Sequence, residues 1–394
     1  MKKPNILLAV IFAAHISFAQ ETNVAENAAQ TNAVAAAFVP TQEQLDSGYY
    51  PVRRTAEVIP ERPPARKITI PNVGRLRVLK GDFHMHTIYS DGHVMPRTRV
   101  AEAIDNGLDI ISVTDHIGGL NRTSLVFGKM GDDFDYDKSH ELATEADTRN
   151  RLVVVRGAEL SGPVFHFNAL FLTNVNQIAT VIDCMDGMIG ASVEQGAFVM
   201  WNHPNWTDRD PDNPPFGLKT GEPMRFLDEV DEWYKKGWIH GIEVLSGATY
   251  FPIAHDWCVE RDLAVIANTD IHNSDLQTYG RQNPMRPMTL VLARRKDLES
   301  VREAFFAKRT IGWAAGNIYG RQPWVGRLYT ACVESEETEN GIMLNNLSDI
   351  ACTIEAGGKI YELPAQGSVL IPKVRRYTVN NWFVGIHKPL AVRP

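Results

Sequence analysis

The sequence predicts an α/β fold, a β/α barrel, followed by a small all-β, sandwich-like domain. Short apolar runs that suit buried parallel strands alternate with helix-like segments from residue 71 to residue 312. Five of these runs have a His, Asp or Glu at or just past their carboxyl end, where barrel proteins build their active sites. Over residues 318–394 the pattern changes to short alternating runs separated by Gly-Gly, Pro and Asn-Asn turns.

Length and composition favour one globular chain with two folded units. The chain has 394 residues, of which 44% are hydrophobic, and a formal net charge of -7. A general nucleic-acid-binding protein needs a basic face. The composition argues against that class, and no nucleic-acid polymer is expected as a partner.

Residues 1–19 have the pattern of a secretory signal peptide. Two lysines form a charged start, residues 6–16 form a short apolar core, and Ser17-Phe18-Ala19 is a small-residue cleavage site. The apolar core is too short for a stable membrane span, and no later stretch is apolar enough to be one. Residues 20–70 follow as a disordered tether and a proline-rich, extended lead-in. The sequence therefore predicts an exported protein, periplasmic or secreted.

The elements of the expected barrel, residues 71–312, follow in a regular order. Pro96 begins a helix over residues 97–106 and Gly107 ends it. A helix over residues 296–308, apolar on one face, closes the domain. The expected strands cover residues 75–79, 108–113, 152–155, 197–201, 241–245 and 263–267, and a further helix covers residues 136–150.

Two histidines at alternate positions open the candidate site. His84 and His86 follow the strand at residues 75–79. Side chains at i and i+2 of an extended segment point to the same face, so both can bind one ion. Asp91 lies in a Ser-Asp-Gly turn that folds its carboxylate back towards them.

The full set of candidate ligands exceeds what one tetrahedral ion needs. It comprises His84, His86, Asp91, His116, Glu159, His166, His203, Asp270 and His272. We therefore expect two or three divalent ions, and imidazole-rich sites suit zinc, manganese or iron. Glu159 is suited to bridge two ions, because a carboxylate can offer one oxygen to each.

The motifs that carry eight of these ligands, all except His166, resemble the successive motifs of the polymerase and histidinol phosphatase (PHP) family, in the family's order. They are His84-Met85-His86 with Ser90-Asp91-Gly92, Thr114-Asp115-His116, Gly157-Ala158-Glu159, His203-Pro204 and Thr269-Asp270-Ile271-His272. The resemblance implies a distorted (β/α)7 barrel with a di- or trinuclear metal centre that hydrolyses phosphoesters. Asn268-Thr269-Asp270 departs from the Gly-Ser-Asp that is common in the family, but the ligands are intact.

The resemblance also implies how the ligands are shared among the ions. His84, His86, Glu159 and Asp270 would hold the first ion, Glu159, His166 and His203 the second, and Asp91, His116 and His272 the third. Glu159, Asp270 and His203 are the residues expected to serve catalysis.

Four residues outside the ligand set have supporting assignments. Asp115 is expected to orient His116 or another ligand through a hydrogen bond. Glu243 is expected to support the mouth of the barrel. His93 and His255 lie near the motifs and are secondary candidates for contact with the substrate.

These inferences predict an exported metal-dependent phosphoesterase that acts on a small phosphomonoester or phosphodiester. The ions would bind phosphoryl oxygens and lower the pKa of a water, so that hydroxide attacks phosphorus. A close alternative is hydrolysis of another ester or an amide by the same ions. The alternative from another class is a non-catalytic metal-containing protein whose C-terminal β-domain binds a glycan or a protein partner.

Two features of the C-terminal domain allow two interpretations each. Cys332 and Cys352 can form a disulfide in an oxidising compartment, or they can be two of four isolated buried thiols with Cys184 and Cys258. The aromatic side chains of this region can form a sugar-binding platform, although such residues more often fill a small β core. They are Trp324, Tyr329, Tyr361, Tyr377, Trp382 and Phe383.

Overall fold

The computed structural model describes residues 65–118, 123–124, 126–130, 134–162, 166–182, 184–204, 225–280 and 285–394. The predicted signal peptide and nearly all of the tether and lead-in lie outside these residues, so they stay predictions. The described residues belong to one compact unit, Pro63–Pro394. None of its described helices is long and apolar enough to cross a membrane.

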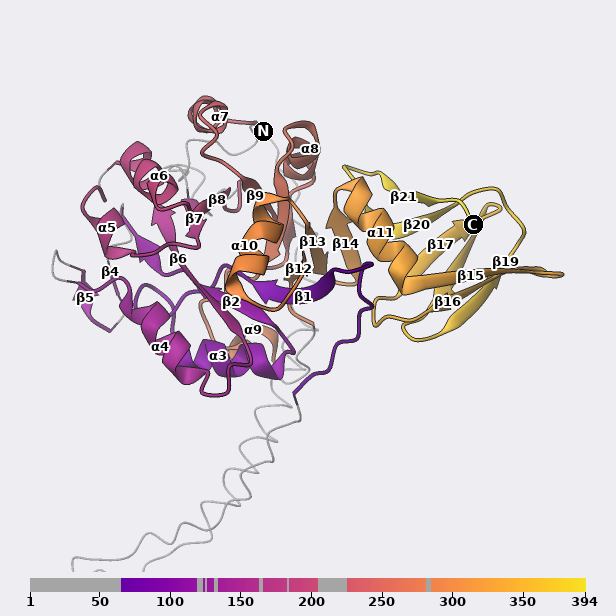
Figure 1. The fold of residues 1–394 in the computed structure, drawn as a ribbon, viewed down its shortest axis with the longest axis horizontal. Helices are drawn as coiled ribbons and strands as arrows, with labels where there is room; N and C mark the ends of the chain where they lie inside the picture. The colour runs from indigo at the N-terminus through magenta and orange to yellow at the C-terminus, as the bar shows by residue number, and fades with distance from the viewer. Residues whose placement is uncertain are drawn as a thin grey trace, which may run out of the picture. The chain divides into compact units, whose positions relative to one another are not determined.

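A large mixed sheet organises the chain (Figure 1). The strands are β1 (Arg77–Asp82), β2 (Ile110–Val113), β3 (His116–Ile117), β4 (Thr123–Ser124), β5 (Gly128–Lys129), β6 (Val153–Ser161), β7 (His166–Leu170), β8 (Phe198–Trp201), β9 (Gly241–Ser246), β10 (Thr249–Tyr250), β11 (Ala264–Asn268), β12 (Met288–Ala293), β13 (Thr310–Ala314), β14 (Asn317–Gly320), β15 (Val333–Thr338), β16 (Gly341–Asn346), β17 (Cys352–Ala356), β18 (Lys359–Leu363), β19 (Ser368–Ile371), β20 (Tyr377–Phe383) and β21 (Pro389–Val392). The large sheet has the order β10-β9-β8-β7-β6-β2-β1-β12-β13-β14-β20-β17-β18, with β11 beside β9, β3 beside β6 and β21 beside β20. β4 and β5 form a separate hairpin, and β15, β16 and β19 form a small sheet.

The predicted parallel strands are present as β2, β6, β8, β9 and β11. The pairs β1–β2, β2–β6, β8–β9 and β9–β11 are parallel. The sequence did not predict β7, which runs antiparallel to both β6 and β8, so the expected simple alternation of parallel strands and helices is wrong here. An isolated parallel bridge between Met85 and Ile271 joins the segments that follow β1 and β11. Closure into a seven-stranded barrel stays a prediction.

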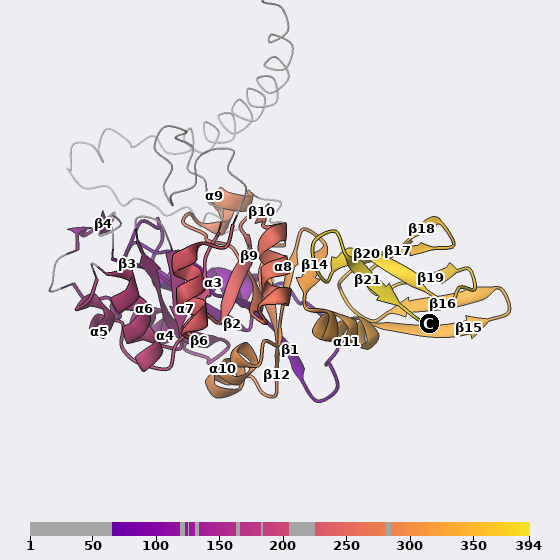
Figure 2. The ribbon, with the colours of Figure 1, turned by 90° about the horizontal axis from the view of Figure 1, so that it is seen from above.

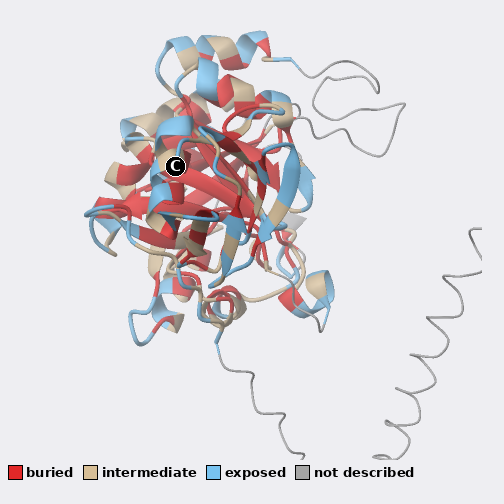
Figure 3. Ribbon diagram, turned by 90° about the vertical axis from the view of Figure 1, so that its right-hand side faces the viewer, coloured by how far each residue is buried: buried red, intermediate tan, exposed pale blue. Residues whose placement is uncertain are grey.

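The helices lie outside the strands (Figures 1 and 2). They are α3 (Pro96–Asp105), α4 (Lys138–Ala146), α5 (Asn176–Ala179), α6 (Met185–Glu194), α7 (Asp228–Lys235), α8 (Pro252–Glu260), α9 (Asp275–Tyr279), α10 (Leu298–Phe306) and α11 (Gln322–Cys332). The predicted helices at residues 97–106 and 296–308 are confirmed as α3 and α10, and that at 136–150 is the shorter α4. Figure 3 shows that the strands inside are mostly buried, while the helices expose their outer faces.

Phenylalanine rings pack between α10 and the strands in one buried cluster. Phe83 and Phe198 each pack edge-on against Phe305 of α10, with ring centroids 4.7 and 5.0 Å apart. Ile110 and Val155, near the starts of β2 and β6, belong to the same buried cluster.

The C-terminal region is not all-β, because it contains α11. Val325, Leu328, Tyr329 and Cys332 form the buried face of this helix, with the 3-1-3 spacing that is typical of an amphipathic helix. β14 pairs in parallel with β20, so the large sheet continues into this region. The predicted domain boundary between residues 312 and 318 stays a prediction.

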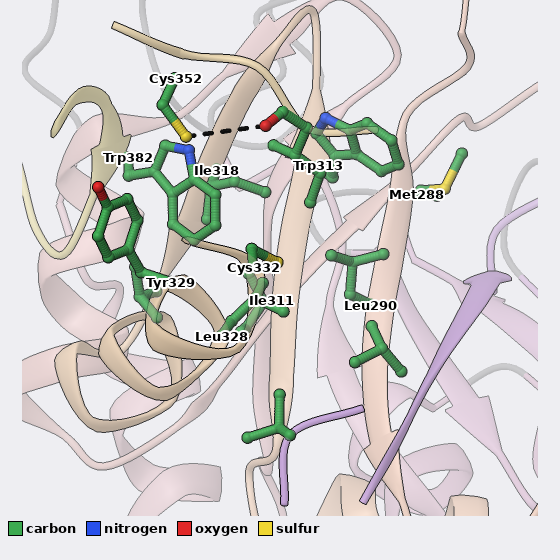
Figure 4. Packing of buried hydrophobic residues seen from close by; sticks show 14 of the residues in the cluster. Met288, Leu290, Ile311, Trp313, Ile318, Leu328, Tyr329, Cys332, Cys352 and Trp382 are labelled. Carbon is green, nitrogen blue, oxygen red and sulfur yellow. Dashed lines mark hydrogen bonds between the residues drawn. The ribbon is translucent and has the colours of Figure 1, made fainter. Parts of the chain in front are cut away.

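The buried cluster in Figure 4 contains both Cys332 and Cys352 and two of the aromatic residues, Tyr329 and Trp382. Cys332 and Cys352 are buried and free, so the disulfide interpretation is wrong. Cys258 is also buried and free, but Cys184 is exposed, contrary to expectation. Trp382 is fully buried and packs edge-on against Tyr329 at a centroid distance of 5.4 Å. These two rings fill the core, as the more frequent use of such residues suggested. Trp324, Tyr361 and Phe383 are only partly buried, so a platform formed by them stays a prediction.

Candidate metal centre

The structure brings all nine predicted ligands to one end of the parallel strands. His84 and His86 follow β1, Asp91 lies in the next turn, His116 begins β3, Glu159 lies on β6, His166 begins β7, His203 follows β8, and Asp270 and His272 follow β11. The carboxyl ends of parallel strands meet at one edge of a sheet. β7 runs in the opposite direction, so its first residue, opposite Ser161 of β6, reaches the same edge.

Glu159 lies at the centre and faces different histidines with its two oxygens. Its Oε1 is 3.2 Å from Nε2 of His84, 3.1 Å from Nδ1 of His166 and 3.4 Å from Nε2 of His203. Its Oε2 is 3.2 Å from Nε2 of His86 and 3.0 Å from Nδ1 of His116. The Glu159 side chain is almost completely buried. This is the arrangement that a bridging carboxylate needs.

Asp270 contacts both histidines of the pair with one oxygen. Its Oδ1 is 3.1 Å from Nε2 of His84 and 3.1 Å from Nε2 of His86. The backbone of Asp270 has φ 51°, and that of His203 has φ 24°. Residues other than glycine rarely adopt positive φ, and such strain is concentrated at functional sites.

Asp91 is the centre of an outer group. Its carboxylate lies 3.6 Å from Nδ1 of His86, 3.5 Å from Nε2 of His116 and 3.3 Å from Nε2 of His272. A Cβ atom on Gly92 would lie 2.5 Å from the His86 backbone. Only glycine therefore lets the Ser-Asp-Gly turn pack directly against the segment that carries His86.

The distances fit divalent ions with nitrogen and oxygen ligands. Two atoms that lie about 2.1 Å from a shared ion are about 3.0 Å apart at a right angle and about 3.4 Å apart at a tetrahedral angle. The contacts of Glu159 and Asp270 with their histidines span this range. Nε2 of His84, Nε2 of His86 and Oε2 of Glu159 are buried without a hydrogen-bond partner, which is costly unless a further atom binds there.

Four groups of donors have all their ligand atoms within 4.8 Å of one another. They are His86-Asp91-His116-His272, His84-His203-Asp270, His84-His86-Glu159 and His116-Glu159-His166. These groups differ from the predicted sharing, because His86 joins the outer group and His116 also lies beside Glu159. How the ligands are shared among the ions stays a prediction.

Without a metal, the histidines and carboxylates of the centre shift one another's pKa values. Burial lowers the pKa of His116, but Glu159 and Asp91 outweigh burial and raise it to about 10. Burial raises the pKa of Glu159, but the nearby histidines, His84 first, outweigh burial and hold it well below its usual value. Burial lowers the pKa of His166 to about 4 despite the carboxylate beside it. A bound cation would replace the proton on His116.

Glu243 supports the centre as the sequence predicted. Its Oε1 accepts a hydrogen bond from Nδ1 of His84 at 3.0 Å, and its Oε2 accepts one from the backbone N–H of His203 at 2.9 Å. The bond to Nδ1 leaves Nε2 of His84 as the ligand atom. Fully buried, Glu243 therefore orients ligands from two strands.

Asp115 supports His86 and not His116. It accepts hydrogen bonds from the backbone N–H of Thr87 and from Oγ of Ser90, both at 2.7 Å. Ser90 in turn lies 3.3 Å from Nδ1 of His86. The carboxylate thus fixes the segment between two candidate ligands.

Sequence reasoning missed two buried asparagines. Nδ2 of Asn202 donates to Oε1 of Glu159 at 2.8 Å and to Oδ1 of Asn168 at 2.9 Å. Asn202 directly precedes His203, and Asn168 lies two residues after His166 on the same face of β7. The sequence signal that could have identified them was their closeness along the chain to His203 and His166.

The two secondary histidines differ in position. His255 is fully buried and lies 3.0 Å from both the Tyr250 hydroxyl and the Gly320 carbonyl, so its prediction as a substrate contact is wrong. His93 is exposed, and its backbone N–H donates to the His272 carbonyl at 2.8 Å. It therefore lies beside the outer group.

Most of this chain is similar to a solved structure from Bacteroides vulgatus. That crystal structure, of a two-domain protein containing a predicted PHP-like metal-dependent phosphoesterase, shares 27% identity and superimposes with a TM-score of 0.73. The match covers 84% of this chain and 99% of that chain. A candidate metal-dependent phosphoesterase from Bifidobacterium adolescentis is 17% identical over 58% of this chain and 96% of its own, with a TM-score of 0.37, too low to support a conclusion. No protein-family model and no curated protein matches the sequence.

Proposed function

We propose that this chain, which is similar over most of its length to a protein containing a predicted PHP-like phosphoesterase, is an exported metal-dependent phosphoesterase. It hydrolyses a small phosphomonoester or phosphodiester at a di- or trinuclear centre. Metal-binding groups and a PHP-like fold support a metal-dependent hydrolase. The number of ions, their identity as zinc, manganese or iron, and the substrate belong to the proposal. Export rests on the pattern of residues 1–19.

The position of Glu159 is the observation that carries the proposal. One buried carboxylate faces His84, His166 and His203 with one oxygen and His86 and His116 with the other. A structural role in a single ion pair would not need five imidazoles around one carboxylate. A bridge between two ions needs this division of the oxygens.

Bound divalent ions would act as Lewis acids that bind phosphoryl oxygens and lower the pKa of water. The ligand set contributes three carboxylates, Asp91, Glu159 and Asp270, so two or three dications leave the centre with net positive charge. A phosphate anion is attracted to such a centre. Neutral imidazole ligands carry no charge, so they bind the ions without cancelling any of the ions' positive charge.

The outer group provides the access route in this proposal. The side chains of Asp91 and His272 are 43% and 27% exposed, whereas those of His84 and His86 are fully buried. A phosphoryl group would therefore approach from the side of Asp91 and His272. The buried histidines exclude bulk water from the inner part of the centre.

The test is hydrolysis of p-nitrophenyl phosphate, a monoester, and bis-p-nitrophenyl phosphate, a diester, by the mature protein loaded with zinc, manganese or iron. We expect turnover of at least one substrate, and a loss of about 100-fold or more in Glu159→Gln. Glu303→Gln is the control, because Glu303 pairs with Arg309 away from the ligand set. If the metal-loaded protein hydrolyses no phosphoester in a broad panel, the proposal is wrong.

A further inference from the structure

Four of the candidate ligands lie on two segments that are joined by few backbone contacts. The segment after β1 carries His84 and His86, and the segment after β11 carries Asp270 and His272. No continuous strand ladder joins them in the described structure; an isolated bridge with two hydrogen bonds lies beside the ligands. The N–H of Asp270 donates to the His84 carbonyl at 2.9 Å, and the N–H of His86 donates to the Ile271 carbonyl at 3.0 Å. We call this contact the β1–β11 junction.

Arg99 of α3 fastens one side of the β1–β11 junction. Its Nε donates to the carbonyl of His86 at 2.9 Å, its Nη2 to the carbonyl of Ile271 at 2.9 Å and its Nη1 to the carbonyl of Asn273 at 2.8 Å. Ile271 and Asn273 are the two neighbours of His272. One guanidinium group therefore holds a ligand of the first segment and both flanks of a ligand of the second.

Arg286 fastens the other side through Asp82. Its Nη2 donates to Oδ2 of Asp82 at 2.5 Å and to Oγ1 of Thr269 at 3.2 Å. The same carboxylate accepts from the backbone N–H groups of His84 and Thr269, both at 3.3 Å, and from the Thr269 hydroxyl at 2.6 Å. Thr269 directly precedes Asp270. The Asp82–Arg286 pair therefore fixes one ligand of each segment, His84 and Asp270.

We propose that Arg99 and Arg286 are positioning residues that set the distance between the two ligand-bearing segments. The inference rests on the proposed metal centre, since it assigns these arginines the alignment of His84 and His86 with Asp270 and His272. The ligand atoms that they align are Nε2 of both histidines and Oδ1 of Asp270, 3.1 Å away from each. Neither arginine is a catalytic residue.

The chemistry of the site explains why arginine is used. Both side chains are completely buried, and a buried charge is costly unless it is paired and hydrogen-bonded. Glu102 pairs with Arg99 at 2.8 Å, and Asp275 lies 3.3 Å from Arg286. The planar guanidinium directs several N–H donors in fixed directions, whereas lysine offers a flexible point charge. Packing alone would not require two buried guanidinium groups, Arg99 and Arg286, in this place.

Arg309 offers a matched control within the same chain. It is buried, its Nε donates to the Leu292 carbonyl at 2.9 Å, and it pairs with Glu303. Leu292 lies opposite Val78, at the start of β1, whereas the ligands follow its end. Arg309 thus makes the same kinds of contact as Arg99 but touches no ligand-bearing segment.

The test compares Arg99→Lys with Arg309→Lys in the mature protein. Metal affinity is measured by titrating the stripped protein with zinc against a chromophoric chelator, and coordination by the visible absorption of the cobalt(II)-loaded protein. We expect Arg99→Lys to bind zinc about 10- to 100-fold more weakly and to change the cobalt spectrum. Arg309→Lys should match the wild type in both measurements, even if its melting temperature falls. A purely structural role would lower the melting temperature of both variants and leave the spectrum unchanged.

Thr269→Val keeps the test decisive if Arg99→Lys does not fold. It preserves shape and removes only the hydroxyl between Asp82 and Arg286, so we expect weaker zinc binding and an altered spectrum here too. The inference is wrong if the folded variants bind zinc with wild-type affinity and give the wild-type spectrum. If the wild-type protein itself binds no metal, the proposed function fails and the inference fails with it. If the wild type binds metal and the variants bind zinc as tightly with the same spectrum, the inference about the arginines is wrong. The proposed function is then not affected.

Discussion

Glu159→Gln and Asp91→Asn should remove different ions from the same protein. Glutamine and asparagine keep the size of the side chain and replace a negatively charged ligand by a neutral amide. Glu159 faces five histidines, and Asp91 faces three. The two variants therefore test whether the centre has an inner and an outer part.

The expected stoichiometry follows from the donor groups. The group His86-Asp91-His116-His272 does not include Glu159 and has four donors, enough for one ion. Glu159→Gln should therefore keep on the order of one equivalent of metal per chain, from the outer group alone. Asp91→Asn should lose about one equivalent relative to the wild type and keep the ions around Glu159.

The assay is elemental analysis of protein that has been stripped with a chelator, reloaded with zinc or manganese and freed of unbound metal. Circular dichroism of each variant confirms that it is folded, and Glu303→Gln serves as the control. If the two variants lose the same ion, the centre has no separate outer group. If neither variant loses metal, Glu159 and Asp91 are not ligands.

Three further predictions concern stability and ligand orientation. In the metal-free protein, burial lowers and the adjacent carboxylates raise the pKa of His116, to about 10 on balance. The folded state therefore binds more protons than the unfolded state above pH 6.5. Through His116 alone, the free energy of unfolding should accordingly fall by roughly 1 kcal/mol per pH unit between pH 6.5 and 10. Denaturant titrations should show no such fall with bound zinc. Trp382→Ala should lower the free energy of unfolding by about 3–5 kcal/mol in the same titrations. Because the ring lies in the C-terminal core, the metal content of this variant should be unchanged. Loss of metal would contradict the separation of this core from the metal centre. Glu243→Gln should weaken zinc binding about 10-fold or more in a chelator competition, because the carboxylate orients His84 and His203, and wild-type affinity would rule out that role.

The pattern of strand ends was visible in the sequence because it depends on local chemistry. Apolar, β-branched runs such as residues 110–113 indicate buried strands, and a polar residue just past the run marks the carboxyl end. His84, Glu159 and Asp270 could be placed near one another from this rule alone. His166 lies in none of the quoted motifs, and its assignment to the second ion came only from the resemblance to the PHP family.

The rest depends on contacts that no local pattern records. β7 is short and follows β6 after a few residues, so its antiparallel direction is set by pairing with β6 and β8. The helix α11 was missed although Val325, Leu328 and Tyr329 have helical spacing, because turn residues around it indicated strands. Arg99 looks like a solvated helix residue in the sequence, and only the fold shows that its guanidinium is buried against three carbonyl groups.

The most direct test of a centre bridged by Glu159 is anomalous X-ray diffraction from crystals of the metal-loaded protein, recorded on both sides of the absorption edge of the bound metal. We predict separate anomalous peaks beside Oε1 and beside Oε2 of Glu159, with histidine nitrogens around each. Crystals of fully loaded protein with no anomalous peak in contact with Glu159 would contradict the bridging role.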